Sequence, residues 1–141
     1  MLTTEETKCV MVIDEELPTG IMVNTAAILG ITLGKLEPAF VGPDVTDGSG
    51  MTHKGIVTQP IPVLKGNKEL LNNLREKLFT PEFEELSVVD FSDVAQSCHV
   101  YEQYIDTAEG KQESEFEYLG VILYGNKKKV NKLTGSMPLL R

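Results

Sequence analysis

Two continuous apolar runs predict the centre of a β-sheet. Residues 9–13 (CVMVI) and 118–124 (YLGVILY) are apolar without the alternation that marks a strand with one face in water. Strands covered on both faces show this pattern, so we expect both to be central strands of an α/β sheet. Weaker strands are predicted at 59–64 and 86–90. The two prolines of 59–64 lack backbone N–H groups, which confines that strand to an edge of the sheet.

A helix is expected after each strand, because apolar residues there recur at helical spacing. The four helices are predicted to begin near Thr19, Asn67, Ser92 and Lys127. Thr19, Asn67 and Ser92 are suitable N-caps, and Gly30 and Gly34 bracket the expected end of the first helix. The third is expected to be a single helix, followed by a solvated loop over 106–117, and its predicted buried stripe is Val94, Cys98, Tyr101 and Ile105.

The alternation of strands and helices predicts the fold class. The order β-α-β-α-β-α-β-α is typical of a three-layer α/β/α sandwich, here with a mixed four-stranded sheet. A length of 141 residues suits one domain spanning residues 1–141.

The negative net charge of the chain makes nucleic acids and anionic membranes unfavourable partners. Thirteen Lys and Arg against 21 Asp and Glu give a net charge of −8. Nucleic acids and anionic membranes are bound mainly through cations, so we expect no strong binding to either.

No apolar segment reaches about 18 residues, and the first eight residues (MLTTEETK) contain no apolar run. We therefore expect neither a membrane span nor a signal peptide. Cys9 and Cys98 are interpreted as buried thiols of a cytoplasmic protein.

Residues 42–55 (GPDVTDGSGMTHKG) are predicted to form a turn-rich connection without periodicity. Asp44, Asp47 and His53 offer two carboxylates and an imidazole, a donor set that divalent cations accept. The same Asp-x-x-Asp-Gly pattern is ordinary turn chemistry, and its spacing is not that of an EF-hand. We predict no metal or cofactor, and we retain Asp44 and His53 as candidate ligand-binding residues because loops of this length are commonly functional.

Two segments resemble peptidyl-tRNA hydrolase type II, which cleaves the ester between a peptide and tRNA. Leu17-Pro18-Thr19-Gly20 follows the first strand, and LGVILYG at 119–125 is followed by VNKLTGSMPLL at 130–140. Over its whole length the chain is similar to an uncharacterised, mainly bacterial family with this fold. The resemblance implies a peptidyl-tRNA hydrolase type II-like fold and, by analogy with dimeric relatives, a homodimer.

The resemblance also implies one candidate catalytic residue. Asp90 matches the aspartate that helps to position the attacking water in the hydrolases, although Phe91 and Ser92 follow it in place of an Ala-Gly sequence. The hydrolases carry a lysine after the glycine that corresponds to Gly20, whereas Ile21 follows here. The carboxylate of the hydrolase site is therefore present and its cation is missing.

A ligand pocket is predicted where the first helix begins and the third strand ends. Gly20 would allow close backbone approach, the free N–H groups of the first turn would face an anion, and Asn24 would look back toward it. Asp90 is expected at the end of its strand, where α/β folds place ligands, or alternatively as a charge at the start of the next helix. Lys132 and Thr134 are a second candidate anion contact, in a stretch that is also typical of a solvated helix end.

Three interpretations of function remain open. The favoured one, because the lysine is missing, is a small-ligand-binding or regulatory module for a small anionic ligand. The alternative is a hydrolase for a small ester or amide of aminoacyl or peptidyl type, with Asp90 positioning water. The third is a purely structural homodimerisation unit. Cys98 and His99 are not counted as a nucleophile–base pair, because adjacent residues of a helix do not face each other.

Overall fold

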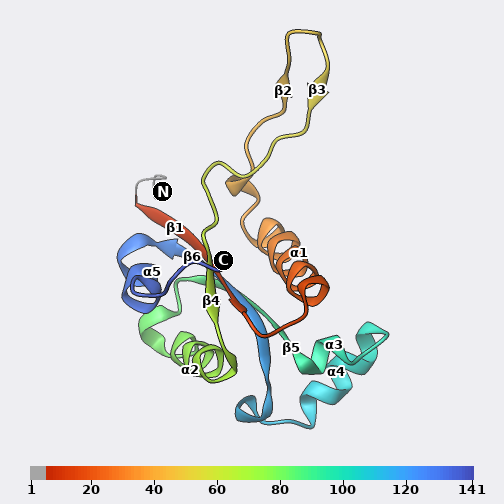
Figure 1. Ribbon diagram of the computed structural model, residues 1–141, viewed down its shortest axis with the longest axis vertical. Helices are drawn as coiled ribbons and strands as arrows, with labels where there is room; N and C mark the ends of the chain where they lie inside the picture. Colours follow the sequence, from red (N-terminus) through yellow and green to blue (C-terminus); the bar gives the residue numbers. More distant parts are fainter. Residues whose placement is uncertain (1–5) are drawn as a thin grey trace.

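A four-stranded mixed sheet forms the centre of the molecule in the computed structural model, which describes residues 6–141 (Figure 1). The sheet order is β4-β1-β6-β5. Its strands are β1 (Thr7–Asp14), β4 (Val63–Gly66), β5 (Ser87–Ser92) and β6 (Tyr118–Asn126). β1 is parallel to β4 and antiparallel to β6, which is antiparallel to β5. The mixed four-stranded sheet and its two central strands are confirmed. The predicted strand at 59–64 does lie at an edge, but its bounds are wrong, because β4 begins at Val63 and both prolines precede it. Residues 1–5, which contribute to the expectation of no signal peptide, lie outside the described residues.

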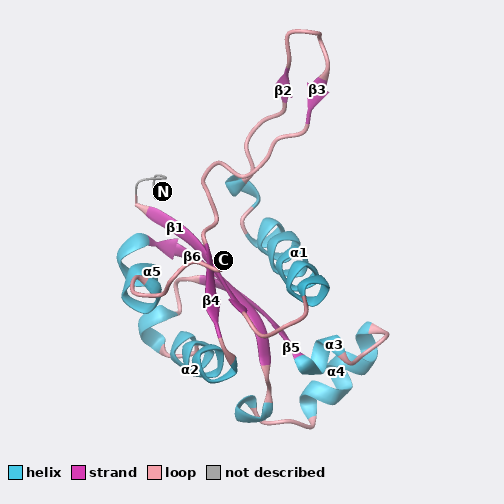
Figure 2. Cartoon of the chain, viewed as in Figure 1, coloured by secondary structure: helices cyan, strands magenta, loops and turns pink. Residues whose placement is uncertain are grey.

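Helices lie against both faces of this sheet (Figure 2). The longest, α1 (Thr19–Leu36), packs on one face, while α2 (Lys68–Leu78) and α5 (Lys127–Thr134) pack on the other. The remaining helical elements are α3 (Asp93–Gln96), α4 (Tyr101–Glu109) and the 3-10 turns η1 (Pro38–Phe40), η2 (Pro81–Phe83) and η3 (Glu113–Glu115).

The apolar runs of β1 and β6 are continuous because both faces of these strands are covered. Val10 and Val12 of β1 belong to the cluster under α2 and α5. Cys9, Met11 and Ile13 belong to the cluster under α1. Successive side chains of a strand point to opposite faces, so one strand supplies both cores.

The first helix is longer than the sequence predicts. Gly30 and Gly34 lie inside α1, which continues to Leu36, and Pro18 rather than Thr19 occupies the N-cap position without a side-chain cap bond. Neither glycine adopts a positive φ, so neither ends the helix.

The expectation that no segment reaches a membrane-spanning length is also wrong. α1 has 18 residues and is long and apolar enough to cross a membrane by length and composition, a test that core helices of soluble proteins also pass.

The predicted third helix is broken into α3 and α4. Residues 97–100 are not helical, and Val100 is extended at the N-cap position of α4. The predicted stripe is not buried as a unit, because Tyr101 is 70% and Ile105 is 46% exposed. α4 also occupies the first part of the predicted 106–117 loop. Ser92 precedes α3, but its buried hydroxyl makes no hydrogen bond with the described residues.

The glycine-rich connection is a β-hairpin that projects from the body of the molecule (Figure 1). We call residues 42–55 the arm. Its two short strands, β2 (Val45–Thr46) and β3 (Thr52–His53), pair antiparallel. The turn chemistry predicted for Asp47 is confirmed, since its Oδ1 accepts hydrogen bonds from the N–H groups of Ser49 and Met51 at 2.9 and 3.0 Å.

Candidate functional site

Asp90 has a cationic partner that the sequence analysis missed. Arg75 of α2 places its Nε 2.6 Å from Oδ2 of Asp90, and the two side chains are only 12% and 18% exposed. The guanidinium also lies 3.7 Å above the ring of Phe79. A signal was present in the sequence, because Arg75 follows the buried Leu71 by four residues and therefore shares its helix face.

The structure corrects the predicted position of Asp90. Asp90 lies within β5, two residues before its end, and not at the strand terminus. Val89 and Phe91 pack with the cluster under α1, whereas Asp90 meets Arg75 of α2 on the other face. Because strand side chains alternate, a residue between two α1-facing neighbours must point away from α1.

Gly20 and Asn24 are therefore not brought together with Asp90. Both are exposed near the start of α1, and neither lines the cavity that contains Asp90. An added Cβ at Gly20 would meet nothing within 4 Å, so no close backbone approach at this position requires glycine.

A cavity of about 440 Å³ lies at the free edge of β5 and includes Asp90 in its lining. One wall comes from α1, through Ile28 and Thr32, and the floor comes from β5, through Val89 and Phe91. The opposite wall is the broken helix, which contributes Ala95, Cys98, His99, Val100, Tyr101 and Tyr104. Since β5 is an edge strand, alternate backbone N–H and C=O groups face away from β6 along this edge. The volume is within the range of small-molecule sites.

Within the described part of the chain, Asp90 and Tyr104 are the half-buried side chains with oxygen atoms that line this cavity. Oδ1 of Asp90 accepts no hydrogen bond there, and the hydroxyl of Tyr104 makes none. Burial, reinforced by the nearby charge of Asp90, raises the pKa of Tyr104. Tyr104 is therefore a neutral hydroxyl at pH 7, able to donate or accept a hydrogen bond.

Cys98 faces this cavity instead of the core. It is half-buried, and its Sγ lies 3.9 Å from Oγ1 of Thr107. The backbone N–H of His99 donates to Oε1 of Gln103, and among the described residues no hydrogen bond joins Cys98 to His99. The prediction that Cys98 is a core residue of a continuous helix is wrong, because the chain leaves the helical path at residue 97.

Asp44 and His53 are engaged within the arm. Oδ1 of Asp44 accepts from the N–H of Gly55 at 2.9 Å, and Lys54 Nζ lies 3.5 Å from its Oδ2. His53 Nε2 lies 2.8 Å from Oδ2 of Asp47. This contact, with the N–H groups of the turn, lowers the pKa of Asp47. Within residues 6–141, no three His, Cys, Asp or Glu side chains are grouped as metal ligands.

Lys132 and Thr134 do not converge on a shared site. Lys132 pairs with Glu82 at 2.5 Å. Thr134 is 2% exposed and donates its hydroxyl hydrogen bond to the carbonyl of Val130 at 2.7 Å. This i to i−4 bond satisfies the hydroxyl inside the helix, so it is not presented to a ligand.

A larger cavity of about 600 Å³ lies at the amino end of β1, and several of its polar side chains are held by hydrogen bonds within the protein. Ser87 Oγ donates to Oε1 of Glu37 at 2.7 Å, and Gln59 Nε2 donates to Oγ1 of Thr7 at 3.0 Å. The cavity beside Asp90 is therefore the better candidate for a ligand site.

Comparison with known proteins places the chain in a family without giving it an activity. The profile of a family described as "Protein of unknown function (DUF2000)" matches residues 7–141. No curated protein matches the chain. Among solved structures, the chain is similar to the protein of unknown function Atu0240 from Agrobacterium tumefaciens strain C58, with a TM-score of 0.84 and 17% identity over 95% of this chain and 97% of that one. This likeness concerns the fold, and the uncharacterised family expected from the sequence is confirmed. The chain belongs to the DUF2000 family of proteins of unknown function.

Proposed function

We propose that the protein is a non-catalytic module that binds a small ligand in the cavity beside Asp90. One observation carries this proposal: a mainly apolar cavity is lined by Tyr104 and by Asp90, whose carboxylate is ion-paired and largely buried. Within residues 6–141, neither Oδ1 of Asp90 nor the Tyr104 hydroxyl has a hydrogen-bond partner. Small-molecule sites combine apolar walls with a few placed polar groups in this way.

The lining favours a neutral ligand with an apolar body and an amide group. Oδ1 of Asp90 can accept from the amide N–H, and Tyr104 can donate to its carbonyl oxygen. Outward-facing backbone groups of β5 add further donors and acceptors. An anionic ligand, as expected from the sequence, fits this cavity less well because Asp90 would repel it and Arg75 already pairs with Asp90.

Hydrolysis of a small ester or amide is the alternative function. In that case Oδ1 of Asp90 would position a water molecule beside Tyr104.

We also infer the finer description of the fold, a three-layer α/β/α sandwich of peptidyl-tRNA hydrolase type II kind. It is supported by helices on both faces of the sheet and by the two resembling segments. A cytoplasmic location and weak nucleic-acid binding remain predictions.

The proposal is tested with N-acetyl amino acid amides that have apolar side chains, screened by ligand-observed NMR and mapped by amide shifts. We expect shifts at β5 and at the α3–α4 break. Tyr104→Phe removes only the hydroxyl and should weaken binding about 3- to 10-fold, the equivalent of one neutral hydrogen bond. Tyr124→Phe is the matched control, because it removes a tyrosine hydroxyl outside this cavity, and it should leave binding unchanged.

Two results would contradict this function. Shifts that map to another surface, or equal affinity of Tyr104→Phe and wild type, would exclude the cavity as the site. Release of free acid from the corresponding N-acetyl amino acid esters, lost in Tyr104→Phe, would favour the hydrolase instead.

A further inference from the structure

The two edges of the sheet differ in how they are covered. At the β4 edge, the N–H of Lys65 donates to the carbonyl of Pro138 at 2.9 Å. The N–H of Leu140 donates to the carbonyl of Val63, also at 2.9 Å, so the last residues of the chain lie along β4 (Figure 1). Within residues 6–141, no strand or bridge pairs with the outer edge of β5. An uncovered edge presents a row of N–H and C=O groups to an extended chain.

The direction of the backbone groups can be followed across the sheet from β4. The N–H of Met11 donates to the carbonyl of Pro62 at 3.0 Å, so the backbone groups of Met11 face β4. Successive residues of a strand present their backbone groups to opposite neighbours. Those of Val12 therefore face β6, where Val12 is opposite Val121. In an antiparallel ladder two opposite residues either face each other or both face away, so the backbone groups of Val121 face β1.

The same alternation decides which groups lie at the open edge of β5. Ile122 follows Val121, so its backbone groups face β5, where Ile122 is opposite Val89. The backbone groups of Val89 therefore face β6, and those of its neighbours Val88 and Asp90 face outward. Each of these two neighbours presents one N–H and one C=O at the open edge. The edge thus offers donors and acceptors at alternate residues, which is the spacing that an antiparallel partner strand requires.

β5 has few of the features that protect the edges of other sheets. Edge strands are commonly protected by Lys, Pro, a bulge or a covering segment. Residues 87–92 contain neither Lys nor Pro, and the register shift falls at the end of the strand, between Phe91 and Ser92. The charge of Asp90 is paired with Arg75. The cavity of about 440 Å³ lies along this edge, between α1 and the α3–α4 helices.

We propose that an extended peptide segment of another protein binds to β5 as a fifth strand of the sheet, antiparallel to β5. The inference rests on the proposed function, because the cavity beside Asp90 then holds one side chain of this peptide. Strand addition combines main-chain hydrogen bonds, which supply affinity, with pockets for alternate side chains, which supply specificity. Antiparallel pairing is favoured because antiparallel pairs outnumber parallel ones in proteins.

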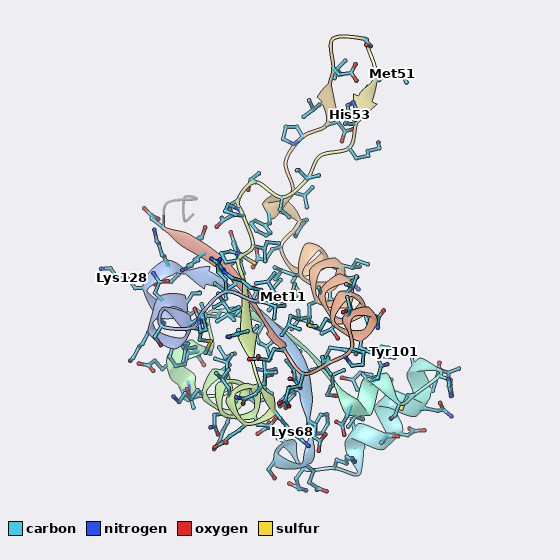
Figure 3. All side chains as sticks on the ribbon, viewed as in Figure 1. Met11, Met51, His53, Lys68, Tyr101 and Lys128 are labelled. Carbon is cyan, nitrogen blue, oxygen red and sulfur yellow. The ribbon has the colours of Figure 1, made fainter. Side chains whose placement is uncertain are left out.

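The lining of the cavity defines the side chains that the peptide should carry. A peptide residue opposite Val89 shares the face of Val89, so its side chain points toward the walls that contain Ile28 and Val100. An apolar side chain fits there. Figure 3 shows Tyr101, which belongs to the same wall as Val100, beside α3 and α4. A peptide residue opposite Asp90 shares the face of its carboxylate, so a hydroxyl or amide side chain that can donate to Oδ1 fits.

Charge favours a basic peptide over an acidic one. Residues 93–109, which include α3 and α4, contain four acidic residues and no Lys or Arg. At the other end of β5, the hydroxyl of Ser87 donates to Oε1 of Glu37 at 2.7 Å, which places a carboxylate there as well. Basic side chains at the two ends of the peptide would therefore face negative charge. A second copy of this chain would instead bring the same acidic region to the contact.

A titration followed by amide shifts tests the proposal with the peptide acetyl-Lys-Thr-Leu-Thr-Lys-amide. Five residues of a strand span about 17 Å, so this peptide is shorter than the six residues of β5. It should bind at least about 10-fold more tightly than N-acetyl-leucine amide, because backbone hydrogen bonds are added. The charge-reversed peptide acetyl-Glu-Thr-Leu-Thr-Glu-amide should bind at least about 10-fold more weakly than the lysine peptide at low salt.

The decisive comparison changes single N–H groups of the lysine peptide. With its leucine opposite Val89, the peptide turns both threonine N–H groups toward β5 and the leucine N–H away from it. N-methylation of either threonine should therefore weaken binding at least about 10-fold, because a hydrogen bond is lost and the methyl group lies between the strands. N-methylation of the leucine is the matched control. It adds the same methyl group on the side that faces away from β5 and should change the affinity by less than about 3-fold.

A variant of the protein tests the same contact from the side of β5. Val88→Pro removes an N–H that faces the open edge and takes no part in the ladder with β6, a position where edge strands accept proline. It should weaken binding of the lysine peptide at least about 10-fold. Val88→Ala is the control, since it shortens the same side chain and keeps the N–H, and its affinity should stay within about 3-fold of wild type. If Val88→Pro does not fold, the N-methyl peptides decide the question with the wild-type protein.

The outcomes separate this inference from the proposed function. Binding of N-acetyl-leucine amide but not of the lysine peptide would exclude strand addition and leave the small-ligand site intact. Binding of neither at about 5 mM would exclude both. Equal losses for all three N-methyl peptides would show that the peptide does not pair with β5. Slow hydrogen exchange of the Val88 and Asp90 amides in the peptide-free protein, becoming fast on dilution, would show that a second copy occupies this edge instead of a peptide.

Discussion

Arg75 and Asp90 form an ion pair between α2 and the edge strand β5, with Nε 2.6 Å from Oδ2. The pair is largely shielded from water by the surrounding residues. Loss of one partner leaves a charge without compensation, whereas loss of both removes the need for compensation. The pair is thus expected to behave as one unit in stability measurements.

Arg75→Met should lower the free energy of unfolding by about 3–5 kcal/mol, because it leaves the Asp90 carboxylate unpaired in a shielded position. Asp90→Leu should lower the free energy of unfolding by a similar amount, since it leaves the Arg75 guanidinium without its partner. The double variant should recover most of the loss, which chemical denaturation in urea would measure. Equal and additive losses in the two single variants would show that the ion pair contributes little.

The two cysteines should differ in reactivity. Cys9 is fully buried, and burial raises the pKa of its thiol to about 12. Cys98 is half-buried and lines the cavity. Because the thiolate is the reactive form, Ellman's reagent should titrate one thiol rapidly in the native protein and the second only on unfolding.

Cys98→Ser is the control for this assignment, and it should abolish the rapid phase. A ligand that occupies the cavity should slow the same phase. Rapid reaction of the Cys98→Ser variant would show that Cys9 is reached in the native state.

The central part of the fold could be predicted from the sequence because burial leaves a direct pattern there. The continuous run 118–124 reflects the cover on both faces of β6. The prolines led to the correct edge position for β4, although they precede that strand and do not remove donors from it. The break between α3 and α4 was missed because Cys98, Tyr101 and Ile105 have helical spacing regardless of whether they are buried. Glycines 30 and 34 misled the prediction of the end of α1, because a helical glycine and a capping glycine are the same residue in sequence.

The candidate site was predictable only in part, because it depends on contacts between distant segments. Asp90 was singled out from the resemblance, but its partner is 15 residues away on another element. The face to which Asp90 points depends on the register of β5, which a short strand does not reveal. Tyr104 was not singled out from the sequence, and its position beside Asp90 follows from the break before α4.

The arm should lose order in acid. The hydrogen bond with His53, followed by those from the N–H groups of Met51 and Ser49, lowers the pKa of Asp47. A depressed carboxyl pKa means that the stabilisation is present above the unfolded value, about pH 4, and is lost as pH falls through the folded value. The protection of the Ser49 and Met51 amides against hydrogen exchange, relative to an unfolded peptide at the same pH, should therefore fall below about pH 4. In Asp47→Asn this protection should not titrate. A wild type whose protection does not change with pH would contradict this account.

No peptidyl-tRNA cleavage and no strong tRNA binding are expected. Ile21 stands where the hydrolases carry a lysine, and the chain has a net charge of −8. Phosphate contacts dominate such affinity, so the balance of charge opposes binding. A turnover assay with peptidyl-tRNA, and a filter-binding assay at about 50 mM salt, would measure both. Cleavage that is lost in a folded Asp90→Asn variant would contradict this prediction.

The close approach of α1 to the sheet should make Gly120 intolerant of a side chain. A Cβ at Gly120 would lie 2.8 Å from Cδ1 of Ile13 and 2.8 Å from Cγ2 of Thr25. Both neighbours are buried, and the Thr25 hydroxyl donates to the carbonyl of Ile21 at 2.7 Å, which holds its rotamer. Gly120→Ala should therefore destabilise the fold by about 1–3 kcal/mol, as overpacking does. Gly48→Ala in the arm, where an added Cβ meets nothing within 4 Å, is the control and should change stability by less than about 0.5 kcal/mol.

A double-mutant cycle identifies the methyl group of Thr25 as a principal cause. Thr25→Ser removes Cγ2 and keeps the hydroxyl that bonds to Ile21. If the clash with Cγ2 causes the loss, Gly120→Ala combined with Thr25→Ser should be more stable than the sum of the single variants predicts, by about 0.5 kcal/mol or more in urea denaturation. Strict additivity would mean that α1 shifts as a whole to admit the new Cβ, and that the spacing between α1 and β6 is not set by Gly120.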